Sequence, residues 1–219
     1  MKRKILLFTF AILLANNVLA QYQEYQLGLM AQPGYNWLMV SNENISNVKN
    51  KFSYKYGLFG SYYFNENYGL SSGIYMLTHS SSYDFKCDKD GSIMNYNHDL
   101  RNSYLQVPVL LKGRTDLISN RFRVLGEFGA GFNFLLDNKD AYTGLYGASD
   151  HFDVKYRTFG TSLVMALGTE ILIFKNSGLM FKVVYDKNFV NLIKDTDETK
   201  GYYSAMKMTN LYLEIGFFF

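Results

Sequence analysis

The best candidates for catalysis in this chain are a histidine and a serine two positions apart, His79 and Ser81. Residues two apart in an extended strand lie on the same face, so both side chains would point the same way. A histidine that takes the serine proton, with a carboxylate as third member, is the arrangement of a hydrolase with a serine nucleophile. The pair therefore suggests a hydrolase, and the strand that carries it decides which substrate it could reach.

Other chemistry is hard to find in the sequence. Neither His79 nor the two remaining histidines, His98 and His151, have a second His or Cys at metal-ligand spacing, so no metal site is predicted. The phosphate-binding loop pattern is absent. The single cysteine, Cys87, excludes an intramolecular disulfide, and we expect it to be an unpaired thiol in a polar loop. We therefore predict no catalytic, cofactor-binding or metal-binding residue, and no cofactor.

Eight segments of strand length alternate between apolar and polar residues, and His79 stands at the end of the third. They cover residues 25–38, 52–64, 68–79, 103–114, 121–135, 156–174, 178–189 and 203–219. Short turns at 65–67, 115–120 and 176–177 alternate with long polar connections at 39–51, 80–102, 136–155 and 190–202. This pattern is typical of a membrane barrel with both termini in the periplasm. The sequence thus predicts an all-β fold, an eight-stranded antiparallel transmembrane β-barrel.

The two faces of these strands differ in a way that indicates their orientation. In the seventh segment, Leu179, Phe181 and Val183 form an apolar row that alternates with Lys182 and Asp186. In this and the two preceding segments the polar face also carries small residues, which suit the crowded interior of a narrow barrel. We therefore expect the apolar rows to face lipid. A soluble lipid-binding barrel is the alternative, and it would carry more charge on its solvated face.

The same alternation turns the candidate pair His79 and Ser81 toward the barrel lumen or its rim, away from a lipid substrate. The spacing of the pair is similar to that of some outer-membrane lipid A deacylases, so a lipid-modifying hydrolase stays open as an alternative. Because the pair faces away from lipid, we predict that the protein is not an enzyme. Inward charges of both signs predict a packed interior and not a pore, with Lys182 held between Glu170 and Glu214 and within ~4 Å of one of them.

The two ends of the chain predict its destination. Basic residues at 2–4, an apolar run at 5–15 and Val18-Leu19-Ala20 predict a signal peptide over residues 1–20 that is cleaved after Ala20, leaving a barrel domain over 21–219. An uncleaved anchor is the alternative. The final alternating strand ends in an aromatic residue, Phe219, which resembles the assembly signal of outer-membrane barrels. We expect insertion into the cell outer membrane by the barrel-assembly machinery, which would bind this strand.

Charge and composition agree with this destination. Three of the 22 basic residues lie in the predicted signal peptide, so the remainder equals the 19 acidic residues. A nearly neutral mature protein suggests no nucleic-acid partner. Aromatic residues make up 17% of the chain, an excess that fits aromatic girdles at the two membrane interfaces.

One string in the fourth segment resembles a known family. Tyr104-Leu105-Gln106-Val107-Pro108-Val109-Leu110-Leu111-Lys112 is similar to the Tyr-Leu-x-Ile-Pro-Leu-Leu-x-Lys signature of the PorT-like outer-membrane barrels, common in Bacteroidetes. Gln106 stands where Glu is frequent, and Val107 where Ile is frequent. The resemblance implies an integral outer-membrane barrel, and some relatives act in protein secretion. Independently of the family, a Pro in a strand predicts a bulge or bend at Pro108.

The expected function is a structural or interaction role in the outer membrane, with a link to secretion that only the resemblance suggests. The expected partners are outer-membrane lipids and a protein partner at the external loops or on the periplasmic side. Aromatic residues in the long connections would bind such a partner or cap the barrel mouth; they are Tyr83, Phe85, Tyr142, Tyr146 and Phe152.

Overall fold

The computed structural model describes residues 24–39, 45–89, 92–118, 120–144, 156–174, 176–191 and 206–219, and the predicted signal peptide lies outside them. For residues 45–47, 85–89, 92–96, 98 and 140–144 only the backbone is described. The strands are β1 (Tyr25–Met39), β2 (Ile45–Asn50), β3 (Phe52–Tyr63), β4 (Tyr68–Lys89), β5 (Ser92–Arg114), β6 (Phe122–Gly144), β7 (Phe159–Leu172), β8 (Gly178–Asn188) and β9 (Lys207–Phe218). Among the described residues, no helix is long and apolar enough to cross a membrane.

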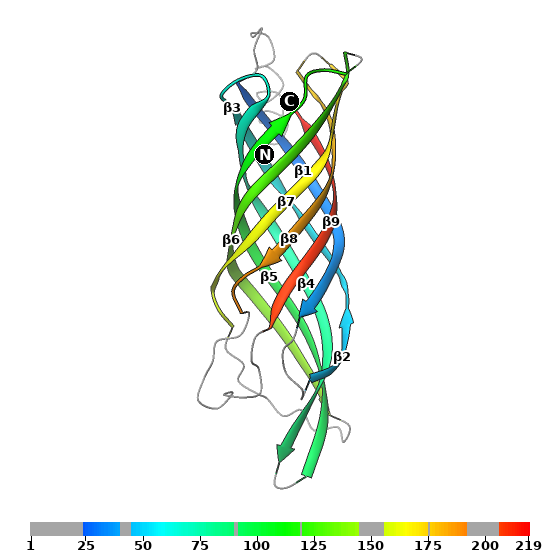
Figure 1. The fold of residues 1–219 in the computed structure, drawn as a ribbon. Helices are drawn as coiled ribbons and strands as arrows, with labels where there is room; N and C mark the ends of the chain where they lie inside the picture. Colours follow the sequence, from blue (N-terminus) through cyan, green and yellow to red (C-terminus); the bar gives the residue numbers. More distant parts are fainter. Residues whose placement is uncertain are drawn as a thin grey trace, which may run out of the picture.

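Eight of these strands close into an antiparallel barrel (Figure 1), which confirms the predicted fold. Each barrel strand pairs with the next barrel strand in the chain, and the pairing of β1 with β9, which joins the two ends of the chain, closes the barrel. The ninth strand, β2, continues the direction of β3 and pairs with β4 beyond the end of β3.

Both termini of the barrel and its short turns lie at one end, called here the terminal end. The β3–β4 turn is built around Asn65, whose side-chain oxygen accepts hydrogen bonds from the backbone N–H groups of Asn67 and Tyr68, at 2.9 and 2.8 Å. Asn120, in the next turn at this end, adopts a left-handed φ of 60°, which asparagine tolerates better than most residues. Local turn chemistry therefore produces the tight connections that the sequence predicted.

The opposite end, called here the hairpin end, differs from the prediction. The segment 80–102 was expected to be a loop, but β4 and β5 continue through it as paired strands as far as Lys89 and Ser92. They project well beyond the rest of the barrel (Figure 1). With β2 and the extended β6 they form a four-stranded sheet, so parts of the expected loops 39–51 and 136–155 are also strands. Polar composition suggested loops here because neither face of this extension needs to be apolar.

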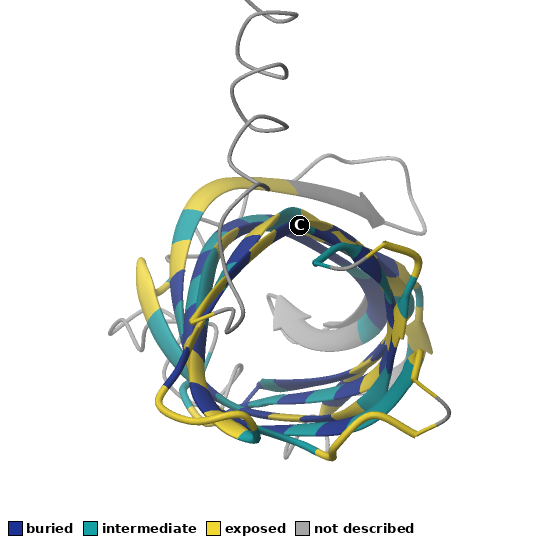
Figure 2. Ribbon diagram, turned by 90° about the horizontal axis from the view of Figure 1, so that it is seen from above, coloured by how far each residue is buried: buried dark blue, intermediate teal, exposed yellow. Residues whose placement is uncertain are grey.

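The predicted alternation between outward and inward side chains is confirmed. In β9, Leu213 is 62% exposed and Ile215 52%, while Tyr212 is fully buried and Glu214 is 4% exposed. The same alternation runs along the other barrel strands, which appear as interleaved buried and exposed segments around a closed ring (Figure 2). The outer wall is thus apolar and the interior mixed, the reverse of a soluble barrel, whose outer face is solvated.

Two apolar layers fill part of the interior. The layer toward the hairpin end contains Leu38, Leu77, Tyr83, Leu100, Tyr104, Leu110, Val164, Ala166, Val184, Met206, Met208 and Tyr212. The layer toward the terminal end contains Met30, Phe59, Tyr75, Leu125, Met180 and Phe218.

Of the bulge or bend predicted at Pro108, the bulge is wrong. Pro108 pairs with Gly131 of β6, and the register with β6 is unchanged on both sides of it. On the other side, the pairs with β4 stop at Val109 and resume at Gln106 in the same register. The carbonyl of Pro108 instead accepts a hydrogen bond from the hydroxyl of Ser72 at 2.7 Å. The missing N–H therefore costs ladder bonds without shifting the strands, and the only shift between β5 and β6 is at Ser103/Tyr104.

Candidate functional site in the barrel interior

Seven charged side chains among the described residues are buried inside the barrel. They are Lys55, Lys112, Glu127, Glu170, Lys182, Asp186 and Glu214, all between 1 and 7% exposed. They come from β3, β5, β6, β7, β8 and β9, and each occupies an inward position of its strand. An unpaired charge in such an interior costs several kcal/mol, so each of them needs a partner.

Lys182 lies between two carboxylates, as predicted, but one of them is a different residue. Its Nζ is 2.8 Å from Glu214 Oε1, and Glu214 stands directly opposite in the β8–β9 register, which confirms the expected contact. The second carboxylate is Glu127 of β6, whose Oε2 is 2.7 Å away, and not Glu170. Lys182 therefore bridges β6 and β9 through the lumen.

The prediction of Glu170 as a partner of Lys182 was wrong because the β7–β8 turn is longer than expected. A tight turn at 176–177 would place Glu170 nearly opposite Lys182, but the turn spans five residues, and the last pair is Leu172 with Gly178. The residue opposite Lys182 is Gly168. A Cβ on Gly168 would meet the backbone oxygen of Phe181, and would lie 2.6 Å from Cγ of Lys182. Glycine is thus required where the lysine stem crosses β7.

Glu170 belongs to a neighbouring group toward the terminal end. Lys112 Nζ is 2.7 Å from Glu170 Oε1, and it also lies 3.9 Å from Glu127 Oε1. On the other side of Glu170, Arg114 is 3.8 Å from Oε2 and stacks over the ring of Tyr63, 3.6 Å from its centroid. Lys112 therefore links both groups into one chain of alternating charges, from Glu214 through Lys182, Glu127, Lys112 and Glu170 to Arg114. We call this the ion chain.

A second, smaller cluster lies toward the hairpin end. Lys55 Nζ is 2.9 Å from Asp186 Oδ2, and it donates a hydrogen bond to Gln106 Oε1 at 2.7 Å. The amide nitrogen of Gln106 donates to the same carboxylate oxygen at 2.9 Å. The ring of Tyr212 lies beneath the ammonium group, with its centroid 4.7 Å from Nζ. The three polar side chains form a closed triangle, which satisfies the buried lysine on several sides.

The buried interior charges are paired. The three buried lysines and Arg114 face four carboxylates, and every one of these charges is within 4 Å of an opposite one. Arg123 of β6, half-buried and opposite Glu170 in the β6–β7 register, adds one more positive charge toward the terminal end. Eight strands leave an interior that side chains just fill, and here ion pairs and two apolar layers fill it. The geometry and electrostatics of the described residues fit an interior closed by ion pairs, not a selective pore.

The candidate pair His79 and Ser81 faces this lumen. Both residues are fully buried, and the ring of His79 contacts that of Tyr104, with centroids 5.7 Å apart. Among the described residues, neither imidazole nitrogen of His79 has a hydrogen-bond partner, and neither has the Ser81 hydroxyl. The pair therefore lacks the carboxylate that would orient a catalytic histidine, and it points away from lipid.

A second serine motif was missed in the sequence analysis. Gly69-Leu70-Ser71-Ser72-Gly73 has the Gly-x-Ser-x-Gly pattern, which marks a nucleophile only at a sharp strand-to-helix turn. Ser71 lies instead inside β4, buried, with its hydroxyl 3.2 Å from that of Ser61. His79 is eight residues further along the same strand, about 26 Å away, so the two cannot act together. In the described residues, no three or more His, Cys, Asp or Glu side chains are grouped to hold a metal ion.

The residues expected to form external loops are placed differently from one another. Tyr83 is fully buried on the inner face of β4 and belongs to the apolar layer. Phe85, Cys87 and His98 lie on β4 and β5, so the loop position predicted for Cys87 is wrong, and Tyr142 lies on β6. Their side chains are outside the described structure. Tyr146, His151 and Phe152 lie outside the described residues altogether.

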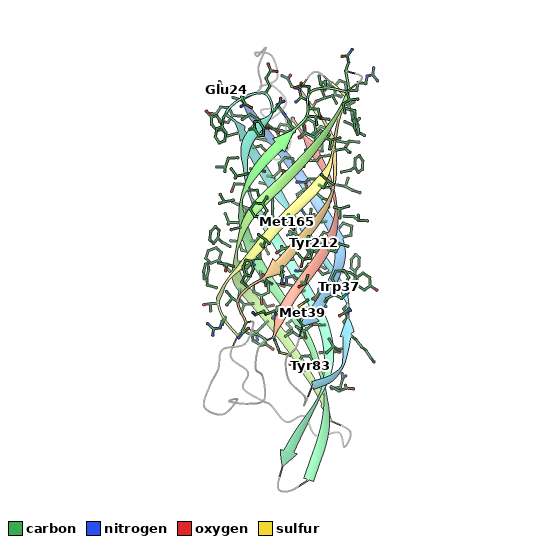
Figure 3. All side chains as sticks on the ribbon, viewed as in Figure 1. Glu24, Trp37, Met39, Tyr83, Met165 and Tyr212 are labelled. Carbon is green, nitrogen blue, oxygen red and sulfur yellow. The ribbon has the colours of Figure 1, made fainter. Side chains whose placement is uncertain are left out.

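The outer wall carries aromatic residues near both ends. Toward the terminal end, the rings of Tyr25 and Tyr62 are 5.1 Å apart, and Phe64 packs edge-on against Tyr62. Toward the hairpin end, Tyr35 and Trp37 lie 6.4 Å apart on β1. Figure 3 shows side chains projecting all along the wall between these levels. This arrangement is that of two aromatic girdles on either side of an apolar band.

Comparison with known proteins agrees with this geometry. A family model described as "Outer membrane protein beta-barrel domain" matches residues 20–194. No curated protein matches the chain.

Among solved structures, an outer-membrane protein has a similar fold. OprG from Pseudomonas aeruginosa is 12% identical, with a TM-score of 0.50, over 89% of this chain and 94% of that one. Ail from Yersinia pestis, solved with the heparin analogue sucrose octasulfate, is 14% identical, with a TM-score of 0.43, over 90% and 100%. Neisserial surface protein A is 10% identical, with a TM-score of 0.41, over 88% and 94%. At 12% identity, OprG is comparable with this chain only in its fold.

Proposed function

Because the chain belongs to the outer membrane protein β-barrel domain family, we propose that it is a closed barrel that acts through contacts at its surface, without transport or catalysis. Its location is the cell outer membrane. The orientation follows from the usual rule for such barrels: the terminal end, with its short turns, faces the periplasm, and the hairpin end faces outward.

The observation that carries this proposal is the interior filled by ion pairs. Removing any member of the ion chain would leave an opposite charge buried, so the interior resists opening. A path for solutes along the axis would have to separate Lys182 from its two carboxylates, and Lys55 from Asp186. With the lumen occupied in this way, contacts with other molecules fall to the outer wall and the two ends.

The hairpin end supports an interaction role. The four-stranded extension of β2, β4, β5 and β6 adds a polar platform that membrane insertion alone does not require. Its exposed side chains include Asp137 and Lys139, 59 and 75% exposed, and the ion pair of Lys51 with Asp99 at 2.6 Å. A water-soluble partner of the cell surface, or an external part of a secretion apparatus, fits a platform of this polarity.

The resemblance to PorT-like barrels supports the secretion link, but the polar residues of the string do not point outward. In the string that carries it, Tyr104, Gln106 and Lys112 all face the lumen, where they belong to the apolar layer, the triangle and the ion chain. The physical roles of these residues are internal. The string therefore supports a shared barrel interior, and the partner has to be identified by experiment.

The experiment is crosslinking in intact cells. A photo-crosslinking residue at Lys139 should give discrete protein adducts, whose identification separates a secretion apparatus from other partners. The matched control is the same residue at Glu66, exposed in a turn at the terminal end. Adducts from Glu66 alone would place the partner on the periplasmic side and contradict the outward platform, and the absence of adducts from either position would contradict an interaction role.

The hydrolase alternative has its own test. Lipid A extracted from cells with and without the protein should give the same mass spectrum, because His79 and Ser81 face the lumen. Loss of an acyl chain that depends on the protein and disappears in the Ser81→Ala variant would overturn the non-enzymatic assignment.

A further inference from the structure

We propose that a pocket in the lumen at the hairpin end binds a hydroxylated carboxylate, such as an acidic sugar. The pocket is formed by β4, β5, β6 and β7 and the end of β8. It is lined by His79, Tyr104, Asn133, Arg157, Phe159, Gly160, Asn188, Val190 and Asn191. This inference goes beyond the proposed surface role and does not depend on it, because it concerns a small molecule and not a protein partner.

The first argument is the set of polar atoms that the pocket leaves without partners. His79 is fully buried, and both of its ring nitrogens lack a hydrogen-bond partner among the described residues. The side-chain oxygens of Asn133 and Asn191 are likewise buried and unpartnered there. Buried polar groups are nearly always hydrogen-bonded, so these atoms call for water or a ligand. A neutral imidazole and two amide oxygens together accept hydrogen bonds from hydroxyl groups, and the imidazole can donate one.

The second argument is the charge at the rim. Arg157 is exposed, and it is the only charged residue among the described residues that line the pocket. The carboxylate of Asp186, two residues before Asn188 on β8, is already engaged by Lys55 and Gln106. A guanidinium group without an acidic neighbour in the lining offers a bidentate site for a carboxylate. The rim therefore prefers an anion, while the deeper groups prefer hydroxyls.

The third argument is shape. The recess encloses about 330 Å³ with its open mouth included, but its deep part has room for only about one water-sized group. Only a hydroxyl or a similarly small group fits beside His79, and the rest of the ligand lies at the mouth. A compact sugar acid can place one hydroxyl in the deep part and its carboxylate beside Arg157 at the rim.

The test uses the full mature chain refolded in lipid nanodiscs and titrated with D-glucuronate. Binding is followed by calorimetry and by the imidazole resonances of ¹⁵N-histidine-labelled protein, assigned with the His79→Gln variant. D-glucose, which lacks the charge, and acetate, which lacks the hydroxyls, serve as comparison ligands. Both should bind at least about tenfold more weakly than glucuronate, because each loses one set of contacts.

The matched variants are Arg157→Gln at the pocket and Arg121→Gln, which removes an exposed arginine at the terminal end. Arg157→Gln should weaken glucuronate about tenfold and leave glucose unchanged, whereas Arg121→Gln should change neither. Should His79→Gln fail to fold, Asn191→Ala tests the deep contacts instead, with a weaker affinity expected for both sugars. A glucuronate-terminated oligosaccharide that binds more tightly than the monosaccharide identifies a glycan end as the source, and equal affinity identifies a free solute.

The proposal is overturned if glucuronate at 50-fold excess over protein leaves the His79 resonance unmoved, a level about sufficient for millimolar affinity at NMR concentrations. It is equally overturned if glucose and glucuronate bind alike, or if Arg121→Gln weakens binding as much as Arg157→Gln.

Discussion

Replacing Lys182 by methionine should destabilise the barrel more than any change on its outer wall at the same depth. The ammonium group lies 2.7 Å from Glu127 and 2.8 Å from Glu214 and is 7% exposed. Its removal leaves Glu127 with only Lys112 at 3.9 Å, and Glu214 with the amide of Gln32. Removing one partner of a buried ion pair costs about 3–5 kcal/mol, a large part of the stability of a domain of this size.

Replacing Lys182 together with its two carboxylates should recover most of the lost stability. In the triple variant Lys182→Met, Glu127→Gln and Glu214→Gln, no uncompensated charge remains at this point of the ion chain. Buried ion pairs often add little net stability over neutral groups of similar volume. We therefore expect the triple variant to lie within about 2 kcal/mol of the original protein, although Lys112 loses its weaker contact with Glu127.

The assay is urea unfolding of the barrel refolded in lipid vesicles. The fluorescence of Trp37, the single tryptophan, reports insertion, because this side chain lies on the outer wall near the hairpin end (Figure 3). The shift in mobility between unboiled and boiled samples on a gel reports the folded fraction. Lys187→Met is the matched control, since Lys187 lies on the same strand but faces outward. A loss below about 1 kcal/mol for Lys182→Met, or a triple variant less stable than the single one, would refute the buried network.

Three further outcomes are expected. Gly168→Ala should cost about 1–3 kcal/mol in the same unfolding assay because a Cβ there would strike the backbone of β8, whereas Gly160→Ala, with its nearest atom 4.0 Å away, should change the stability by less than about 0.5 kcal/mol. Met165→Arg, midway along the outer wall, should cost about 2–4 kcal/mol, and Phe174→Arg, at the terminal end, about 0–1 kcal/mol; equal costs would contradict the membrane-spanning orientation. Deleting Phe219, which exchanges two backbone hydrogen bonds with β1, should reduce the heat-modifiable form in cells more than after refolding in vitro. Equal losses in both settings would argue against a role of this residue in assisted assembly.

The fold was predictable from the sequence because a barrel strand in a membrane must satisfy a strict rule. Every second residue faces lipid, so the alternation of Leu213 and Ile215 with Tyr212 and Glu214 determines which face is inside. Five of the eight predicted strands begin and end within four residues of the observed ones. The rule no longer applies where the strands extend beyond the hydrocarbon core of the membrane. For this reason the extension of β4 and β5 was expected to be a loop.

The interior was predictable only in part. Whether a side chain faces the lumen or the lipid follows from its odd or even position along the strand. This alternation was sufficient to predict that Lys182 is buried among carboxylates. Pairing with Glu214 followed from neighbouring strands, but Glu127 lies across the lumen, on a strand that does not pair with β8. The contact of Lys112 with Glu170 is of the same kind. Contacts across the lumen depend on the tilt and stagger of the strands in the barrel, and these cannot be derived from the register of a single hairpin.

The central claim, a membrane barrel whose interior is closed by paired charges, is tested most directly by its electrical conductance. The refolded full-length mature protein, inserted into a planar lipid bilayer, should give no discrete current steps in 1 M KCl, a concentration that strongly screens exposed charges but not buried ones. The Lys182→Met variant, if it inserts, should give transient openings because its interior is weakened. Steady conductance steps from the unaltered protein, proportional to salt concentration, would contradict the closed interior.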